Sequence, residues 1–484
     1  MNCLPPHRLS GGNSRLLRLA SPFLAALLLI ACKPTDSRPG APKPNASNVA
    51  PHPSSIPAGN RQPADLTAPE RVFFQYAVYF LSQTEHQPIA LLESELAQLP
   101  NAPGKVAELS ENPTGVELFA RLESNVADNY SPIDLIGLQH FGRGVSREQA
   151  QSLQTSKQAL IFNFAAPFEK RWLALRGATE IMESYAKKVD GLIWDEETRE
   201  IFSPATWHEL RLSEWTNEIP DINQHVTIHA YKNGEHIRAI TLGMQKAGLP
   251  DLVIEQFPWS QNGSVGNLIN LASQALAEGQ QLQNEREFDL DIRAIKHAAL
   301  RATHLESLKP NGKAVAQLAL LAAEPEEGDP DNHIAELSFE RYRGVDEFAR
   351  QEEAISSLFG WEDPVDRIKH NEKILAASER AREQLPALRG AFNQGLEPGE
   401  FIQLKAPFAT PDGGREFMWV EVSEWKNDAI KGLLKNQPRD IPDLQAGQVV
   451  KIDEAEVFDF LRQFPDDRRE GNETGKIISE SLNK

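Results

Sequence analysis

The chain of 484 residues contains only two cysteines, Cys3 and Cys32, and both lie close to its start. Everything beyond residue 32 is therefore free of cysteine. This excludes a disulfide framework, a cysteine nucleophile and a cysteine metal ligand from the body of the chain. Hydrophobic cores must hold the folded part together. A content of 40% hydrophobic and 25% charged residues is ordinary for a globular protein that folds around such cores.

The first 31 residues have the layout of a secretory signal. Three arginines and no carboxylate precede an apolar run, residues 23–31, which is too short to span a bilayer. The run ends in Leu29-Ile30-Ala31-Cys32, which resembles the lipobox of bacterial lipoproteins. The resemblance implies that the Cys32 thiol receives a diacylglyceryl group and that the leader is then cut before Cys32.

The residue after the cysteine bears on the membrane that carries the protein. Position 33 is Lys rather than Asp, which favours the outer membrane by the sorting rule of enteric-type bacteria. Acyl chains buried in the bilayer would hold the protein there, with its body facing the periplasm or the cell surface.

Residues 32–69 are expected to form a disordered tether after the lipidated cysteine. Residues 33–69 hold nine prolines among small and polar residues and show no hydrophobic periodicity. Such a segment cannot bury a core and stays extended.

The net charge of −19 is spread over the part of the chain that follows the basic leader. An acidic protein repels phosphate backbones, so we expect no nucleic acid among the partners.

The body has the pattern of a multi-domain α+β protein with antiparallel or mixed sheets packed against helices. Short β-branched and aromatic runs such as 72–80 and 159–165 alternate with amphipathic helical stripes such as 175–189. The expected organisation is a signal peptide over 1–31, a lipidated tether over 32–69, an α+β domain over 70–285, a small α+β unit over 286–360 and a C-terminal α+β domain over 361–484.

The C-terminal domain resembles the uncharacterised family called domain of unknown function 2314. The matching text is Ala381-Arg382, Leu385-Pro386, Phe417-Met418-Trp419-Val420-Glu421-Val422, Gly432-Leu433, Asn436-Gln437-Pro438, Leu444-Gln445-Ala446-Gly447 and Asp459-Phe460. The family has no established activity, so the resemblance implies a fold unit without a function. The middle region is similar to the domain of unknown function 4261, through residues 241–244 and 248–252.

Three segments have alternative interpretations as ligand sites. Residues 224–242 predict a hairpin with Tyr231 opposite His236 and His229 opposite Arg238; His225, His229 and His236 would then be candidates for zinc, although Arg238 disfavours a cation there. The loop 262–266 before a helix could bind phosphate, and the acidic loop 324–331 could bind calcium. For each segment the simpler structural interpretation is preferred, and no metal or cofactor is assigned.

Acid–base chemistry in the C-terminal domain would depend on carboxylates, since no histidine follows His370. The candidates are Asp412, Glu416, Glu421 and Asp459. A pair of them near Trp419 could suit a sugar, but we expect Trp419 to pack in the core of its sheet.

No catalytic residue is assigned. The sequence favours a lipid-anchored cell-envelope protein that is a non-enzymatic binding module for another envelope or secreted protein. The alternatives are a hydrolase of envelope polymers that uses carboxylates and an immunity-type protein that neutralises a toxin.

Overall fold

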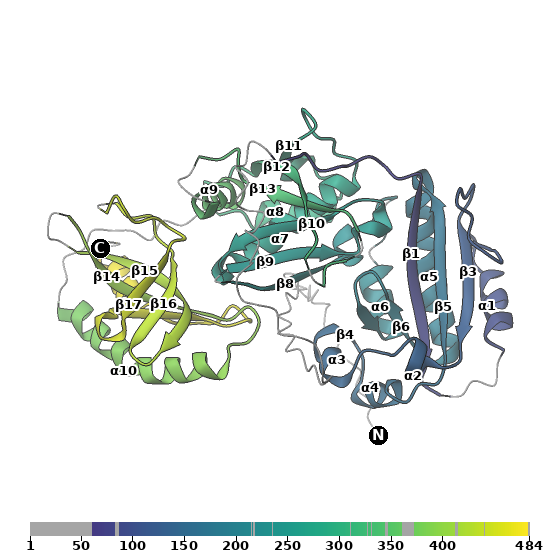
Figure 1. Cartoon of the computed structure of the whole chain (residues 1–484), viewed down its shortest axis with the longest axis horizontal. Coiled ribbons are helices and arrows are strands. Elements are labelled where there is room, and N and C mark those ends of the chain that lie inside the picture. The colour runs from purple at the N-terminus through teal and green to yellow at the C-terminus, as the bar shows by residue number, and fades with distance from the viewer. Residues whose placement is uncertain are drawn as a thin grey trace, which may run out of the picture.

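The computed structural model describes residues 61–82, 87–213, 215, 218–234, 236–309, 311–326, 328–330, 332–343, 347–360, 372–411, 415–439 and 441–482. The signal peptide, Cys32 and the tether up to residue 60 lie outside the described residues. The protein is α+β and multi-domain, as expected. Its three sheets lie in a row, with the second between the first and the third (Figure 1).

The first sheet has seven strands. In spatial order they are β2 (Gly104–Lys105), β3 (Glu117–Glu123), β5 (Ala159–Pro167), β1 (Arg71–Phe80), β6 (Gly191–Asp195), β7 (Glu200–Phe202) and β4 (Gly142–Arg143). One face packs against α1 (Pro88–Leu96), α5 (Arg171–Val189) and α6 (Pro204–Arg211). The other face packs against α2 (Val126–Asn129), α3 (Leu135–Phe141) and α4 (Arg147–Leu153). The expected strands and the expected helix at 175–189 are confirmed here.

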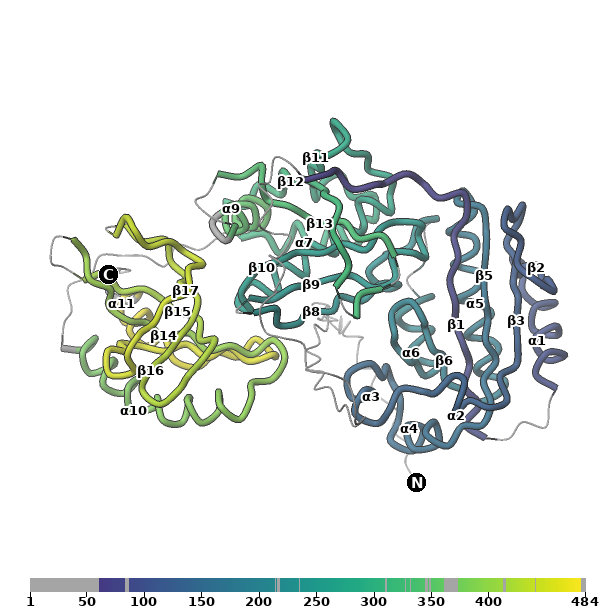
Figure 2. The backbone as a smooth tube through the Cα atoms, in the orientation of Figure 1, coloured from purple at the N-terminus to yellow at the C-terminus, as the bar shows by residue number. Residues whose placement is uncertain are grey.

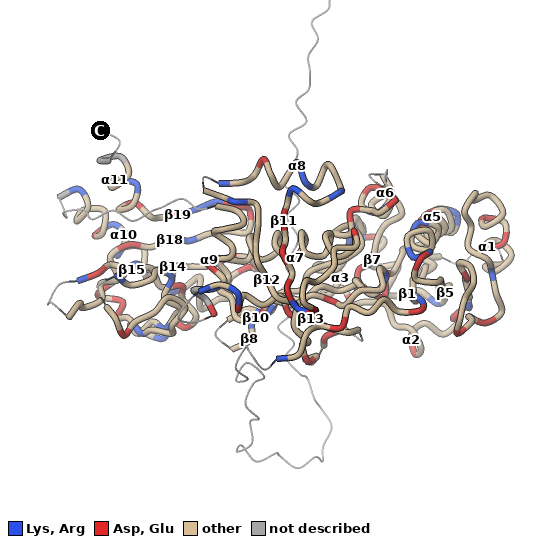
Figure 3. The backbone as a smooth tube through the Cα atoms, turned by 90° about the horizontal axis from the view of Figure 1, so that it is seen from above, with Lys and Arg blue, Asp and Glu red and all other residues tan. Residues whose placement is uncertain are grey.

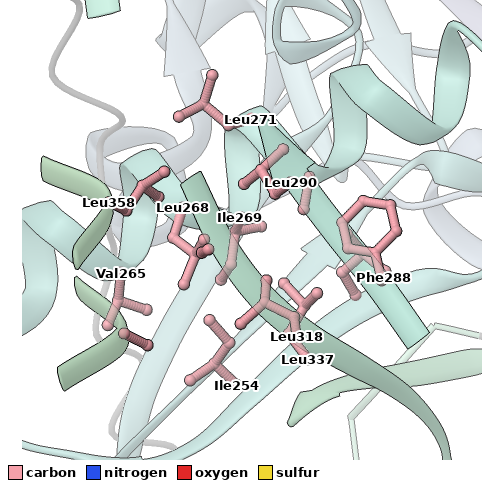
Figure 4. Packing of buried hydrophobic residues seen from close by; sticks show 14 of the residues in the cluster. Ile254, Val265, Leu268, Ile269, Leu271, Phe288, Leu290, Leu318, Leu337 and Leu358 are labelled. Carbon is pink, nitrogen blue, oxygen red and sulfur yellow. The ribbon is translucent and has the colours of Figure 1, made fainter. Parts of the chain in front are cut away.

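The second sheet has six strands in the order β11 (Glu287–Asp291), β12 (Val315–Ala323), β13 (Ile334–Ser338), β10 (Asp251–Phe257), β9 (His236–Leu242) and β8 (Thr227–Asn233). Its core lies under α7 (Asn262–Ala277) and α9 (Glu347–Phe359), and α8 (Ala298–Glu306) follows β11. Figure 4 shows Leu268 and Ile269 of α7 beside Leu358 of α9 and Leu318 of β12.

The boundary expected at residue 285 falls inside this second sheet. β8, β9 and β10 precede that residue, whereas β11, β12 and β13 follow it. The joining contact is the parallel pair of β10 with β13, in which Asp251 lies opposite Ile334. A pairing between strands so far apart in sequence leaves no local pattern, so the sequence suggested two units where the structure has one sheet.

The tether also ends earlier than expected. Residues 62–64 lie along β12, where Ala322 N donates to Gln62 O and Ala64 N donates to Leu320 O, each at 3.0 Å. Ala64 is buried in the second core, and Arg61 forms a bidentate ion pair with Glu336. The chain then crosses to β1 of the first sheet (Figure 2). The segment 61–66 is therefore part of the fold.

The third sheet is antiparallel, with strands in the order β17 (Val449–Asp453), β16 (Ala429–Leu434), β15 (Arg415–Lys426), β14 (Phe401–Ala409), β18 (Asp459–Gln463) and β19 (Arg469–Gly471). Helix α10 (Glu372–Gln394) packs Leu385 and Leu388 into the core of this sheet. The C-terminal helix α11 (Glu473–Leu482) packs against α10.

Two local patterns in this third unit give wrong predictions. The stripe of Ile374, Ala377, Ala381 and Leu385 predicts a helix that ends at Pro386, and residues 454–461 predict a short final helix. The helix predicted to end at Pro386 continues to Gln394, because Pro386 is solvent-exposed while Leu385 and Leu388 stay anchored in the core. The helix predicted over 454–461 is only a single turn, η8 (Glu454–Glu456), followed by β18. Phe460 there pairs with Leu404 of β14, so tertiary pairing overrides the local preference.

None of the helices in the described part of the chain is both long enough and apolar enough to cross a membrane.

Candidate functional site

A surface groove of about 430 Å³ lies in the C-terminal domain, between α10 and one end of the third sheet. We call it the C-terminal groove. It is lined by Leu375, Arg382, Pro407, Arg415, Phe417, Ala455, Glu456 and Phe458. Its volume is within the range of small-ligand and peptide side-chain pockets.

Two aromatic rings form the floor of the groove. The ring centroids of Phe417 and Phe458 are 4.6 Å apart, and the rings are tilted by 53°. Phe417 precedes the buried Met418 on β15, so the alternation of a strand turns Phe417 toward the opposite face. Phe458 is fixed by its backbone, since its N–H donates to Lys405 O at 2.7 Å.

Two arginines lie on the rim of the groove. Arg382 on α10 and Arg415 at the start of β15 are both exposed, and among the described residues neither forms an ion pair. Arg382 Nη1 donates only to Ser378 Oγ, at 3.2 Å. Glu456 is the single acidic residue of the lining. The groove therefore has an excess of positive charge, whereas acidic residues are spread over all three units of this protein (Figure 3).

Trp419 lies two residues beyond the groove floor and is only half-buried, so its predicted place in the core is wrong. It faces Lys405 across the β14–β15 pair, and Lys405 Nζ lies 5.5 Å from the Trp419 ring centroid. Burial lowers the pKa of Lys405, and nearby Asp459 opposes that shift. The core tryptophan of this domain is Trp425, which is 2% exposed and donates from Nε1 to Glu454 Oε2 at 2.7 Å.

The predicted C-terminal carboxylates have structural contacts. Asp459 is buried; its Oδ2 accepts from Thr474 N at 2.9 Å and its Oδ1 accepts from Phe460 N at 2.8 Å, which fixes the start of α11. Glu421 is also buried and accepts from Ser260 N at 3.3 Å, so it joins the third sheet to the η6 turn (Trp259–Gln261). Glu416 accepts from Arg439 N at 3.0 Å. Asp412 lies outside the described residues.

The hairpin histidines are not brought together. Tyr231 pairs with Arg238 and His229 with Ile240, two residues away from the predicted register. The sequence favours a turn at Lys232-Asn233-Gly234, but Asn233 pairs with His236, so the chain reverses after Asn233. Because the shift is even, the same side chains still share one face.

Each buried histidine has a separate environment. His229 packs against Phe141, with ring centroids 5.3 Å apart and the rings tilted by 38°, and burial lowers its pKa to about 4. His225 follows the η4 turn (Ile222–Gln224) beside Trp215, and burial lowers its pKa well below the usual value. In the described part of the chain, no three His, Cys, Asp or Glu residues gather as metal ligands.

Arg238 instead binds the acidic loop, so the structure joins two segments that the sequence treats separately. Its Nη1 and Nη2 donate to the two carboxylate oxygens of Asp329 at 2.8 and 2.9 Å, and its Nε donates to Glu255 at 2.7 Å. Glu326 accepts from the Tyr231 hydroxyl at 3.2 Å. The acidic loop therefore supplies an ion-pair partner for Arg238 and a hydrogen-bond partner for Tyr231. Glu327 and Asp331 lie outside the described residues.

The segment with the alternative interpretation as a phosphate loop is helical. Residues 262–266 form the first turns of α7, and Val265 and Gly266 are buried against the core of the second sheet. The backbone N–H groups of Val265 and Gly266 are therefore covered by the core of the protein.

No motif in the sequence indicates a fourth feature, a buried charge cluster between the first and second sheets. Lys246 on the η5 turn (Met244–Ala247) places its Nζ 2.6 Å from Asp195 Oδ2 at the end of β6. Arg211 Nη2 lies 3.1 Å from the same oxygen and 3.6 Å from Glu200 Oε2. Burial raises the pKa of nearby Glu197 to about 7, against the opposing effect of Lys246.

Residues 241–244 and 248–252, which are the segments similar to the domain of unknown function 4261, have a structural role beside this charge cluster. Thr241 Oγ1 donates to Asp251 Oδ1 at 2.8 Å, and Met244 N donates to the same oxygen at 3.2 Å. These bonds fix the turn that carries Lys246. Gly248 has a φ of +67°, and a Cβ there would meet the Phe168 ring at 2.8 Å. The motif therefore anchors the second sheet to the first.

Comparison with known proteins gives one match. Residues 371–483 match the model of a family described as "Uncharacterized protein conserved in bacteria (DUF2314)". Neither a curated protein nor a solved structure shows significant similarity to the chain. All residues that line the C-terminal groove fall within the matched region. The C-terminal region of this protein, residues 371–483, is therefore similar to the DUF2314 family, as its sequence suggests.

Proposed function

We propose that this protein is a lipid-anchored component of the bacterial cell envelope whose body binds another envelope or secreted protein. The observation that carries the binding role is the C-terminal groove, which is lined by a pair of aromatic rings and by two exposed arginines. Aromatic and arginine side chains are the residue types that dominate binding sites between proteins. A toxin-neutralising immunity protein would be one case of such a binder.

The anchoring role rests on Leu29-Ile30-Ala31-Cys32 and on the proline-rich segment behind it. The lipid on Cys32 would hold the chain at the membrane, and Lys33 favours the outer membrane. The chain enters the fold at Arg61 on the second sheet, so the tether would run from residue 33 to residue 60. In polyproline II form it would reach on the order of 90 Å.

The contacts of the carboxylates favour binding over hydrolysis. A carboxylate pair that cleaves an envelope polymer must face the substrate from a cleft. Asp459 is committed to the start of α11 and Glu421 to the contact with Ser260. Their substitution is expected to change folding rather than catalysis.

Two measurements test this function. Radiolabelled palmitate should be incorporated by the wild-type chain and not by Cys32→Ser, and the labelled protein should fractionate with the outer membrane. For the binding role, a photoreactive amino acid is placed at Leu375 in the groove, and at Leu173 on α5 as the control. These residues are 49% and 44% exposed, so the two probes are equally accessible.

Crosslinking in living cells should give a discrete adduct with another protein from position 375 and none from position 173. Equal yields from both positions, or no adduct from position 375, would refute the groove as the binding site. Label on Cys32→Ser would refute the anchor.

A further inference from the structure

The chemistry of the C-terminal groove specifies its occupant more narrowly than the function above requires. We infer that the groove takes an extended peptide segment of the partner protein that carries acidic side chains next to aromatic or aliphatic ones. The inference rests on the proposed binding function and adds the chemical class of the ligand.

The apolar half of the ligand is specified by the lining. Three separate segments, which are α10, the β14–β15 hairpin and η8 with the loop after it, contribute Leu375, Pro407, Phe417, Ala455 and Phe458. Leu375 is 49% exposed, an unusual degree for a leucine on a helix that otherwise packs its leucines inward. The volume of about 430 Å³ accommodates a few side chains and is too small for a folded domain.

The charged half is specified by the arginines. Arg382 lies on the helix and Arg415 on the strand, and both line the groove, so an acidic ligand in it would meet positive charge from two elements. Neither forms an ion pair with a described residue, in contrast to Arg389, which lies two turns further along α10 and pairs with Glu454 at 3.0 Å. Guanidinium groups bind carboxylates in a bidentate manner and with charge assistance.

Charge complementarity selects the occupant. The protein as a whole has a net charge of −19 and therefore repels acidic segments, except where basic residues exceed acidic ones. The groove is such a place, with two arginines and one glutamate. A basic peptide would meet repulsion from both arginines, and a purely apolar one would leave them without partners.

The ligand class is tested with a library of random eight-residue peptides displayed on phage. The target is the full chain with Cys32→Ser, and the same chain with Arg382→Glu and Arg415→Glu serves for counter-selection. Peptides that combine Asp or Glu with Phe, Tyr, Trp or Leu should be enriched. Fluorescence anisotropy then measures the affinity of the enriched peptides.

Arg382→Gln and Arg415→Gln should each weaken peptide binding roughly tenfold, which is the effect of losing one charge-assisted contact. Arg468→Gln is the matched control, because Arg468 is an exposed arginine of the same domain that lies outside the groove. Its affinity should equal that of the wild type. Affinity should also fall as the salt concentration rises.

Enrichment of basic peptides, no enrichment, or peptides that bind the doubly substituted chain equally well would overturn the inference. These failures can be told apart from a failure of the proposed function. If the crosslink from position 375 persists in cells while acidic peptides fail, the groove binds a partner of another chemistry. If the crosslink is also absent, the binding function itself is refuted.

Discussion

Lys246 Nζ lies 2.6 Å from Asp195 Oδ2, and both side chains are completely buried. One comes from the turn after β9 of the second sheet and the other from the end of β6 of the first sheet. Taking two charges out of water costs several kcal/mol, which this geometry and the further contact with Arg211 offset. The pair therefore fixes how the first two sheets pack.

Lys246→Met should lower the free energy of unfolding by about 3 kcal/mol, because it leaves a carboxylate buried with one cation fewer. Urea unfolding followed by tryptophan fluorescence measures this. The control is Lys187→Met, which removes an exposed ion pair with Glu183 and should change stability by less than about 0.5 kcal/mol. Equal effects of the two substitutions would show that the buried pair does not hold the sheets together.

The pH dependence of stability should carry a signature of Glu197. Its pKa is raised from the ordinary 4.5 to about 7 in the folded protein, so the folded state binds more protons than the unfolded state between these values. The stability of the wild type should therefore fall as the pH rises from about 4.5 to about 7.

Glu197→Gln isolates this contribution. It keeps an oxygen that can accept from Gln75 N and removes the titration. The variant should gain about 2–3 kcal/mol on the wild type between pH 5 and pH 8. A difference in stability that is constant with pH would show that Glu197 titrates normally.

Trp419 and Trp425 of the C-terminal domain should differ in their contribution to stability. Trp425→Ala removes a buried ring and its hydrogen bond to Glu454, and should cost about 3–5 kcal/mol. Trp419→Ala removes a half-buried ring that covers Lys405 and should cost about 1 kcal/mol. Thermal unfolding of both variants measures the two losses of stability. A larger loss for Trp419→Ala would contradict the assignment of Trp425 to the core.

These two residues also show how far the sequence alone leads. The Met-Trp-Val-Glu-Val alternation predicts a strand correctly, and β15 confirms it. Which face of a strand is buried depends on the partner that covers it. The alternation therefore leaves open whether Trp419 or its neighbours Met418 and Val420 point inward. The structure buries the neighbours.

Contacts between segments that are far apart in the sequence cannot be predicted from local patterns. Local signals were sufficient where a motif acts on its own backbone, as at Ser203, whose side chain accepts from Thr206 N and caps α6. They were insufficient for the Lys246–Asp195 pair and for the groove. The lining of the groove comes from segments up to 83 residues apart, Leu375 to Phe458, that no periodicity connects.

The segment 61–66 should matter for stability although it is rich in small and polar residues. A chain that begins at residue 61 should unfold like the complete mature chain. One that begins at residue 70 loses the hydrogen bonds to β12, the Arg61–Glu336 ion pair and the buried Ala64. We expect a cost of about 2 kcal/mol, measured by urea unfolding. Identical stability of the two truncated chains would show that residues 61–69 belong to the tether and do not stabilise the fold.

The central claim is that the C-terminal groove binds a protein partner through its two rim arginines. The most direct test is the yield of the crosslink from a photoreactive residue at position 375 in cells. Charge reversal by Arg382→Glu with Arg415→Glu should reduce that yield at least tenfold, whereas Arg121→Glu with Arg468→Glu, which reverses two exposed arginines elsewhere, should leave it unchanged. An adduct whose yield is the same in all three chains would contradict the account.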